Sequence, residues 1–578
     1  MKPSPALLHL RLCAGFLFTL ALILALATAT SRSLHAVTYT WTGDGTDNSW
    51  TTADNWDANG IAKSGTDTEI ILANTGNYTV TQNSGATVSF NRLVIASGSG
   101  AVSIGGGNYL ASNATTGGFA EIVNNGGSSS LSNRLTLNYD LHYTGNGTQL
   151  NISGTVMGTQ GIIVEAAATS VLALTSSGDN TFQGGLTVKS GTVTLTRPAA
   201  AGVGAITMEG GTLRNSTSAG TAMTALNQAL NISGNFSLGS SGTERGFTFT
   251  KAVTLTGTND LRSINLVSKS KATDLLILDG AIGDAGGNNG LKLTNMGTVR
   301  FGGAASNTYT GQTMLWGQNV NLVLQKTDAA TAIAGDLFIG HGTVTIEASA
   351  TQRIAGKLYT TTYATSDLQI NSGATLAVAG ETGLATRSLT TDSTGVAGTL
   401  LLENTATLHV SDYWTDQENG FSAGQRNTAA AALTWAGSLT LDGGATLNFD
   451  LAADPAASDA IILTGTGTDG DASVITFLDT TGDAPVTINL NVLNAATLPS
   501  GTTYTLLSVT GGFVNLDTQT LAQRLTLNTN GIEGTLALTD NALTFTTPAA
   551  PIPEPVTSAL VIVCAAAAVS AFRRKIKN

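Results

Sequence analysis

The sequence predicts an all-β protein: a single-stranded, right-handed parallel β-helix, with helices only in a terminal signal segment and a terminal membrane segment. Short apolar runs alternate at a two-residue spacing and end at Gly turns, which is typical of strands. Only 11% of the 578 residues are charged, and 68 are Gly. Globular proteins average roughly 25% charged residues and about 7% Gly, so this chain is poor in charge and rich in Gly. Strands with two or three inward side chains cannot bury a core alone, so we expect them to stack on copies of themselves.

The clearest unit of this pattern runs from Leu172 to Leu213. Its expected inward residues are Leu186, Val188, Val193, Leu195, Ile206 and Met208. Its expected outward residues are Thr187, Lys189, Thr194 and Thr207. Ser190-Gly191 and Gly210-Gly211 separate the strands, because Gly adopts backbone conformations that a Cβ would obstruct.

Two segments of this unit resemble a known repeat. Residues 180–188 read NTFQGGLTV and residues 204–213 read GAITMEGGTL. Both are similar to the autotransporter-associated β-strand repeat, a family associated with parallel β-helices. A degraded copy begins with NTYTGQT at Asn307 and ends at Ile346, with Gln312 where a second Gly is expected. The resemblance implies a shape and names no reaction.

Residues 61–545 form the predicted β-helix body, in which the same pattern returns at irregular spacing. Examples are Leu93/Ile95 with Val102/Ile104, Leu337/Ile339 with Val344/Ile346, Leu368/Ile370 with Leu376/Val378, Leu400/Leu402 with Leu408/Val410, and Leu439/Leu441 with Leu447/Phe449. Turns of about 20 to 25 residues are expected for such repeats. Only the Ala-rich stretches 329–334 and 429–433 favour a short turn of helix, which we place in loops.

Cysteine and charge separate the body from the two ends of the chain. Cys13 and Cys564 lie in the terminal apolar segments, so an exported body has no cysteine and needs no disulfide. Seven of the 26 Lys and Arg residues also lie in the terminal segments, which leaves the body 19 basic against 38 acidic residues, net −19. Such a surface repels phosphate backbones and anionic lipids, which argues against nucleic-acid binding.

Residues 1–36 are typical of a signal peptide. Lys2 and Arg11 precede an uncharged apolar run that ends at Ala29. Small residues then offer cleavage sites after Ala29 or Ala36, and Ala36 is preferred because Val37 opens the first strand. This interpretation implies export by the Sec machinery. An uncleaved membrane anchor is the alternative.

Residues 37–60 form a predicted N-terminal cap that holds three of the six Trp residues, Trp41, Trp50 and Trp56. The first turn of a solenoid needs a cover, and three indoles supply a large apolar area. This opening also resembles the starts of other proteins of the repeat group. The alternative is a sugar-stacking platform in which a cation is held by Asp44, Asp47, Asp54 and Asp57.

The strand pattern ends at a Pro-rich linker, residues 546–555. Seventeen uncharged residues follow, from Val556 to Phe572, and then the basic cluster Arg573, Arg574 and Lys575. Seventeen residues are the lower limit for spanning a bilayer, and the basic cluster predicts a cytoplasmic C-terminus.

The motif Pro553, Glu554 and Pro555, the apolar run and the basic end together resemble a PEP-CTERM sorting signal. The resemblance implies recognition by an exosortase-type membrane protease, with transient membrane insertion through residues 556–572. It further implies removal of the sorting tail 556–578 and release to the surface or extracellular matrix of a Gram-negative bacterium. A permanent single-span anchor is the alternative.

The body offers few candidates for catalysis or metal binding. Gly340-His341-Gly342 resembles a tripeptide of polygalacturonases, but the paired carboxylates that glycoside cleavage needs do not accompany it. We therefore place His341 in a turn. His142, His341 and His409 are too widely separated to predict a transition-metal site. Asp469-Gly470-Asp471 and residues 284–288 resemble fragments of calcium loops and complete none.

These observations favour an exported structural or adhesive β-helix protein of the cell surface or biofilm matrix. We predict no enzyme activity, no catalytic residue, no cofactor and no tightly bound metal. Expected partners are the Sec machinery and the exosortase-type protease, together with extracellular polysaccharide or further copies of the chain. The alternative is a carbohydrate-binding or carbohydrate-active β-helix protein.

Overall fold

The computed structural model describes residues 37–550 except 116, 217–224, 241–244, 328–329, 348–349, 386–387, 392–396, 411–412, 415–425, 428–429, 466–471, 479–483 and 494–496. The predicted signal peptide with Ala36, the sorting residues Pro553, Glu554, Pro555, Arg573, Arg574 and Lys575, and the segment 556–572 lie outside the described residues. The chain divides into two compact units. The first takes most residues up to Gly356 and also Tyr363–Leu368, and the second takes Lys357–Thr362 and most residues from Gln369 onward.

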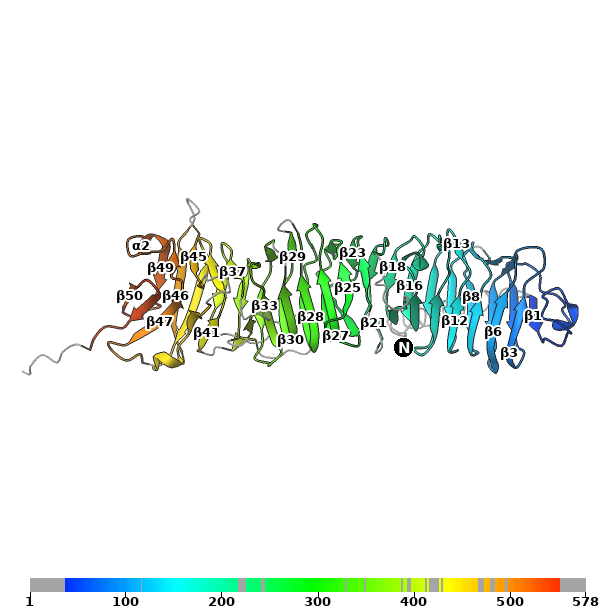
Figure 1. The fold of residues 1–578 in the computed structure, drawn as a ribbon, viewed down its shortest axis with the longest axis horizontal. Helices are drawn as coiled ribbons and strands as arrows, with labels where there is room; N and C mark the ends of the chain where they lie inside the picture. Colours follow the sequence, from blue (N-terminus) through cyan, green and yellow to red (C-terminus); the bar gives the residue numbers. More distant parts are fainter. Residues whose placement is uncertain are drawn as a thin grey trace, which may run out of the picture. The chain divides into compact units, whose positions relative to one another are not determined.

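Three parallel sheets build the first unit, whose strands follow one another in chain order (Figure 1). Sheet A contains β1 (Val37–Trp41), β2 (Thr68–Leu72), β5 (Arg92–Ile95), β8 (Ala120–Asn124), β11 (Leu141–Thr144), β14 (Ile162–Glu165), β16 (Leu186–Ser190), β18 (Ile206–Met208), β20 (Leu230–Ile232), β23 (Val253–Leu255) and β26 (Ile282–Gly283). Sheet C contains β4 (Val88–Phe90), β7 (Leu110–Ser112), β10 (Leu135–Leu137) and β13 (Val156–Gly158).

Sheet B of the first unit contains the longest strands. Its members are β3 (Gly76–Thr81), β6 (Ser99–Gly105), β9 (Ser128–Leu131), β12 (Gln149–Ile152), β15 (Val171–Leu174), β17 (Thr192–Leu195), β19 (Thr212–Asn215), β21 (Phe236–Gly239), β22 (Phe247–Phe249), β24 (Leu261–Val267), β25 (Asp274–Leu278), β27 (Gly290–Phe301), β28 (Thr313–Leu324) and β30 (Leu337–Ile346). Two further strands, β29 (Thr331–Ile333) and β31 (Gln352–Ile354), pair in parallel.

The second unit is also built mainly of parallel strands. One sheet contains β34 (Thr375–Val378), β37 (Thr399–Leu402), β42 (Ser438–Leu441), β45 (Ile475–Phe477) and β48 (Phe513–Val514). Another contains β32 (Leu358–Thr360), β35 (Glu381–Gly383), β38 (Thr407–His409), β43 (Thr446–Leu451), β46 (Val486–Val492) and β49 (Leu525–Asn528). Shorter strands are β36 (Leu389–Thr390), β39 (Tyr413–Trp414) and β40 (Arg426–Asn427). Strand β33 (Ser366–Ile370) has its first three residues in the first unit and its last two in the second.

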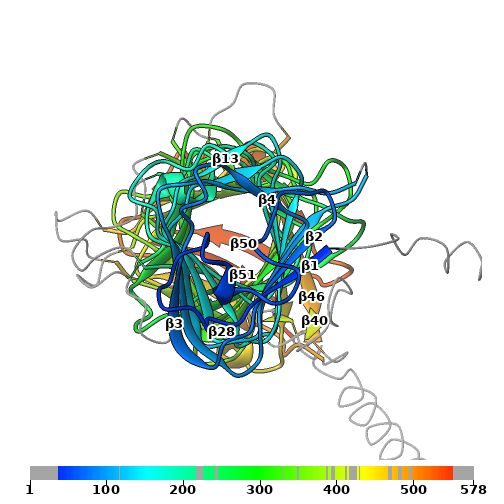
Figure 2. The same cartoon turned by 90° about the vertical axis from the view of Figure 1, so that its right-hand side faces the viewer.

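Strand register shows that each solenoid turn pairs with the next. Leu186 lies opposite Ile206 and Leu230 opposite Val253, so these turns take 20 and 23 residues. Viewed end-on in Figure 2, β1 and β2 of sheet A, β3 and β28 of sheet B, and β4 and β13 of sheet C lie on different sides of the first unit. Inward apolar side chains fill the space between the sheets. The predicted parallel β-solenoid is confirmed.

Burial of the clearest repeat follows the predicted alternation. Val193 and Leu195 are 0% exposed, and the Lys189 side chain is 39% exposed and lies 3.5 Å from the Glu165 carboxylate. Thr194 differs from the prediction because it is buried, and its hydroxyl has no hydrogen-bond partner. Most strand residues thus follow the two-residue period, and β17, whose four residues are all buried, is the exception.

The Asn residue of the repeat motif links neighbouring turns by side-chain hydrogen bonds. Asn180 accepts a hydrogen bond from the Val156 backbone N–H at 2.9 Å and donates one to the Ala200 carbonyl at 2.8 Å. Asn307 of the degraded copy likewise accepts from Ile282 N–H at 2.9 Å and donates to Ala332 O at 2.6 Å. Each Asn therefore ties the turn before it to the turn after it. The aromatic residues two positions later, Phe182 and Tyr309, are 0% exposed.

The three N-terminal Trp residues form a packed cluster beside the first strand. Trp41, Trp50 and Trp56 are 1%, 1% and 5% exposed. Ring centroids lie 5.2 Å apart for Trp41 and Trp56 and 4.8 Å apart for Trp50 and Trp56, both edge to face. These indoles are therefore used for packing, and a sugar-stacking platform does not fit their burial.

Three predictions about strand direction and helices in the body are corrected. Strands β47 (Thr503–Val509), β51 (Ala542–Thr546) and β50 (Thr535–Leu538) are antiparallel, because tight turns such as the one between β50 and β51 can join only antiparallel neighbours. Parallel pairing continues from β47 through β44 (Ala460–Leu463) to β41 (Ala432–Trp435).

The other corrections concern helices. A four-residue helix, α2 (Leu521–Arg524), lies in the body, with short 3-10 turns η1 (Ala53–Asn55), η2 (Pro198–Ala201) and η3 (Pro455–Ala457). The described parts of the two Ala-rich stretches include strand residues of β29 and β41, because their apolar side chains are buried against neighbouring turns. Within the described ranges, no helix is long and apolar enough to cross a membrane.

Candidate functional site

Strands β27, β28 and β30 depart from the regular stack at one level of sheet B. Register shifts between Thr294 and Met296 of β27, and between Leu315 and Asn321 of β28. Asn295, at the first shift, has a φ of 71°, which is uncommon for a residue other than Gly. Bulges of this kind re-aim side chains and are frequent next to functional sites.

The tripeptide Gly340-His341-Gly342 lies inside β30 at this level. The predicted turn is therefore wrong: the strand continues through both Gly residues and resumes its pairing at Thr343, which lies opposite Asn321. A Cβ at Gly340 would lie 2.3 Å from two ring atoms of Trp316. Gly is needed here because the indole lies directly over the backbone, a close approach that only a residue without a side chain allows.

Four rings and one ammonium group meet at the bulge. We call this set the bulged aromatic site, and its members are Lys292, Trp316, Phe338, His341 and Tyr363. His341 stacks on Tyr363 with centroids 4.0 Å apart and an interplanar angle of 24°. Trp316 lies edge to face with His341 at 5.3 Å and stacks on Phe338 at 6.2 Å. Lys292 Nζ lies 5.6 Å from the centroid of the Trp316 ring, within the range of a cation–π contact.

The site is open on its outer side. Tyr363 is 39% exposed and Phe338 is 6% exposed, while Trp316 and His341 are half-buried. Phe338 thus forms a floor under rings that solvent reaches. This differs from the N-terminal Trp cluster, whose rings are covered.

Polar residues accompany the rings, either in contact with them or close to them along the strand. His341 Nδ1 lies 3.2 Å from Thr365 Oγ1, which holds the imidazole in place. Gln318 and Asn319 follow Trp316 within the bulge of β28 and are exposed. Aromatic faces beside amide, hydroxyl and ammonium groups suit a ligand with both an apolar face and hydrogen-bonding edges.

A second polar cluster lies on the second unit. Glu381 accepts from Lys357 Nζ at 3.0 Å and Tyr359 Oη at 3.1 Å, and lies 3.2 Å from His409 Nε2. Burial alone would raise the pKa of Glu381, but Lys357, His409 and Tyr359 outweigh it and lower that pKa. Asn448 continues the row, with its amide 3.0 Å from His409 Nδ1. Each of these polar groups has a partner within the cluster, and the cluster therefore links successive turns.

In the calcium-like loop after β26, the Asp284 carboxylate accepts hydrogen bonds from the loop backbone and from Thr310 of the next turn. Burial alone would raise the pKa of Asp284, but hydrogen bonds from Thr310, Gly286 and Asn289 outweigh it and lower that pKa. The Asp284 carboxylate accepts from Thr310 N at 3.0 Å, Asn289 N at 3.1 Å and Gly286 N at 3.0 Å. In the part of the chain that the structure covers, no three His, Cys, Asp or Glu side chains form a group that could hold a metal ion. Asp469-Gly470-Asp471 lies outside the described residues.

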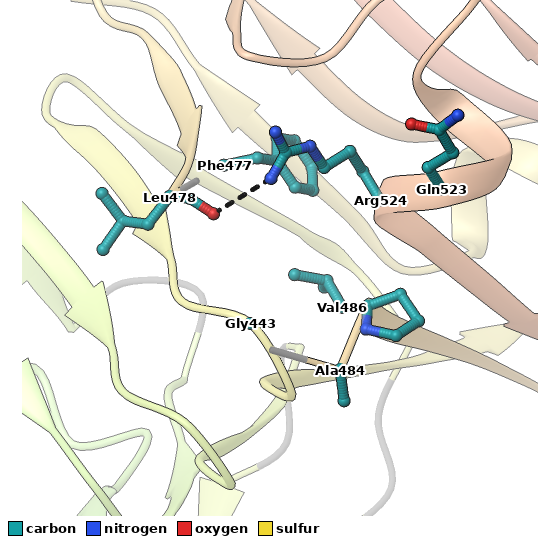
Figure 3. A pocket seen from close by; sticks show the side chains of 8 residues that line it. Gly443, Phe477, Leu478, Ala484, Val486, Gln523 and Arg524 are labelled. Atoms are coloured by element: carbon teal, nitrogen blue, oxygen red, sulfur yellow. Dashed lines mark hydrogen bonds between the residues drawn. The ribbon is translucent and has the colours of Figure 1, made fainter. Parts of the chain in front are cut away.

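A small pocket of about 40 Å³ opens on the second unit (Figure 3). Its lining residues are Gly443, Phe477, Leu478, Ala484, Pro485, Val486, Gln523 and Arg524. Arg524 Nη1 donates to the Leu478 carbonyl at 3.5 Å across it. Ligand sites for small molecules usually measure about 300 Å³ or more, so this pocket has room only for water molecules.

The sequence singled out His341 and missed its aromatic partners. His142 stacks on the exposed Phe119 with centroids 3.9 Å apart, and His409 joins the Glu381 cluster. Trp316 and Tyr363 carry no sequence motif of their own. The available signal was Gly340-His341-Gly342 itself, because Gly on both sides of a ring residue inside a strand pattern indicates a bulge.

Comparison with known proteins adds no identification: no family model and no curated protein matches this chain.

Proposed function

We propose that this protein is an exported structural or adhesive protein of the cell surface or extracellular matrix. Its body acts through a parallel β-solenoid, for which we propose right-handed winding. Export by the Sec machinery removes residues 1–36 after Ala36. An exosortase-type protease then cuts near Pro555 after transient insertion of residues 556–572 in the inner membrane.

One observation carries this proposal: a solenoid body is joined to a C-terminal segment with the order Pro-Glu-Pro, apolar run and basic cluster. The basic cluster favours a cytoplasmic end, which presents Pro553-Glu554-Pro555 at the outer face of the membrane. Stacked turns, in which backbone groups of one turn pair with the next, suit a load-bearing or adhesive scaffold.

Intact mass of the protein from the surface and secreted fractions tests the proposal. We expect a chain that begins near Val37 and ends near Pro555, found outside the cell. A chain that still includes residues 556–578 and stays in the inner membrane would favour a permanent anchor. Alanine substitution of Pro553, Glu554 and Pro555 together should retain the protein in the membrane fraction. As the matched control, alanine substitution of Pro548 and Pro551, which lie in the same linker outside the motif, should not.

The second candidate is a carbohydrate-binding or carbohydrate-active protein, and the bulged aromatic site favours its binding form. Activity is tested by incubating the protein with pectins and alginates, with and without calcium, and measuring reducing and unsaturated ends. We expect no sustained release. Release that disappears in His341→Ala would instead assign catalysis to this site.

A further inference from the structure

We propose that the bulged aromatic site binds polysaccharide by stacking the exposed Tyr363 on the C–H face of a sugar ring, with Trp316, edge to face with Tyr363, bordering that sugar. The inference names the class of ligand for the adhesive function proposed above, and it rests on that proposed function. Its evidence is local to the first unit.

The first step is that the site interrupts an otherwise regular stack. Three neighbouring strands lose register at one level, although a regular ladder would bury its backbone groups more completely. Gly340 leaves the room that the Trp316 ring occupies. The irregularity thus presents aromatic rings at the outer face of sheet B.

The second step is that packing leaves part of the Trp316, His341 and Tyr363 rings open to solvent. Tyr363 is 39% exposed, whereas Trp41 and Trp50 of the N-terminal cluster are each 1% exposed. His341 stacks on Tyr363 at 4.0 Å and fixes its orientation, while the Thr365 hydroxyl holds His341. Rings held in place before binding lose little conformational freedom when a ligand arrives.

The third step is chemical complementarity. A pyranose ring has an apolar C–H face bordered by hydroxyl groups, and it therefore needs an aromatic face beside hydrogen-bonding groups. The exposed amides of Gln318 and Asn319 lie on the same strand as Trp316. Lys292 adds a cation over the indole. The surroundings hence suit a sugar polymer better than a purely apolar partner.

Affinity electrophoresis of the purified full chain tests the inference. The gels are non-denaturing, contain a mild detergent, and hold xyloglucan, galactomannan, dextran or alginate. We expect at least one polysaccharide to retard the protein. Trp316→Ala and Tyr363→Ala should each weaken that binding at least tenfold, and Trp316→Phe should restore most of it because a ring remains. Each variant should keep the strand-type circular dichroism spectrum and the melting temperature of the parent.

Phe119→Ala is the matched control, because Phe119 is also exposed and stacked on a His but lies outside the bulge. It should bind like the parent. Absence of retardation by all four polysaccharides would overturn the inference, as would equal losses in Phe119→Ala and Trp316→Ala. Neither result would affect the mass and fractionation test of export, and failure of that test would leave the binding result standing, so the two proposals fail separately.

Discussion

The repeat at residues 172–213 and the degraded copy at 307–346 lie in the same unit, and their strands pair with neighbouring turns in different ways. In the first, β16 pairs with β18 and β17 with β19 without any register shift. In the second, β27, β28 and β30 shift register around Trp316. Both copies keep the Asn that bonds the turns before and after it. Anchoring by this Asn holds the stack, so the middle of a strand can be re-aimed without losing the fold.

The largest effect should come from the core of the regular repeat. Val193→Asp should lower the free energy of unfolding by on the order of 4 kcal/mol, because an unpaired carboxylate would be buried among aliphatic side chains. Lys189→Ala should change it by less than about 0.5 kcal/mol, since that side chain is partly exposed. Thermal melts of the two variants make the comparison, and the reverse ranking would show that the assignment of inward and outward residues is wrong.

A pair of Gly substitutions contrasts the two copies directly. A Cβ at Gly184 would lie 2.3 Å from the backbone N of Gly161, which cannot move aside, whereas the Cβ at Gly340 meets a side-chain ring. Gly184→Ala should therefore cost about 3 kcal/mol of stability. Gly340→Ala should cost less, about 2 kcal/mol, because the half-buried indole can shift by a small amount whereas the Gly161 backbone cannot.

The readouts for this pair are denaturant melts and Trp fluorescence. Gly340→Ala should shift the emission of the full chain, and the shift should vanish in a Trp316→Phe background. An unchanged spectrum, or equal destabilisation by both Gly variants, would contradict the contrast between backbone and side-chain contacts.

The anchoring Asn should matter equally in both copies. Asn180→Ala and Asn307→Ala each leave a buried backbone N–H and a buried carbonyl without their partner, which should cost about 3 kcal/mol in each case. Urea melts of the two variants measure this. A cost more than twofold smaller for Asn307 would show that the bulged copy no longer depends on its anchor.

The last effect depends on pH and concerns the basic residue two positions after β17 in the first copy and two positions after β28 in the second. Arg197 pairs with Asp179 at the surface, whereas Lys326 is 0% exposed and its Nζ has no hydrogen-bond partner. Burial lowers the pKa of Lys326 from 10.5 to about 8. Because the unfolded chain holds this proton more tightly, the folded state should gain up to about 3 kcal/mol as pH rises from 8 to 10.5 and should keep none of it below pH 8.

Lys326→Met removes this titration. The variant should be more stable than the parent at pH 7 by about 2 kcal/mol, and the difference should shrink as pH approaches 10. Urea melts of both proteins between pH 7 and 10 measure it, with Arg197→Met as the control that shows no such trend. A difference that stays constant with pH would place the Lys326 ammonium in solvent.

The sequence by itself determined the solenoid. Alternation at a two-residue spacing identified the inward apolar residues of β16, β17 and β18, because strand geometry places every second side chain on one face. The Asn and aromatic residues of the motif were visible in both copies, although their bonds between turns were not. The antiparallel end of the second unit was missed, since alternation alone does not reveal the direction of a partner strand.

Only the tertiary structure decided the bulged aromatic site. Lys292, Trp316, His341 and Tyr363 lie on successive turns and are separated by more than 20 residues along the chain. Their meeting depends on the register of β27, β28 and β30, which is set by pairing between turns. Gly340 and Gly342 signalled an irregularity, but the position of the indole over Gly340 followed from stacking. Local sequence thus fixes which residues face inward, and the register between turns fixes which outward residues become neighbours.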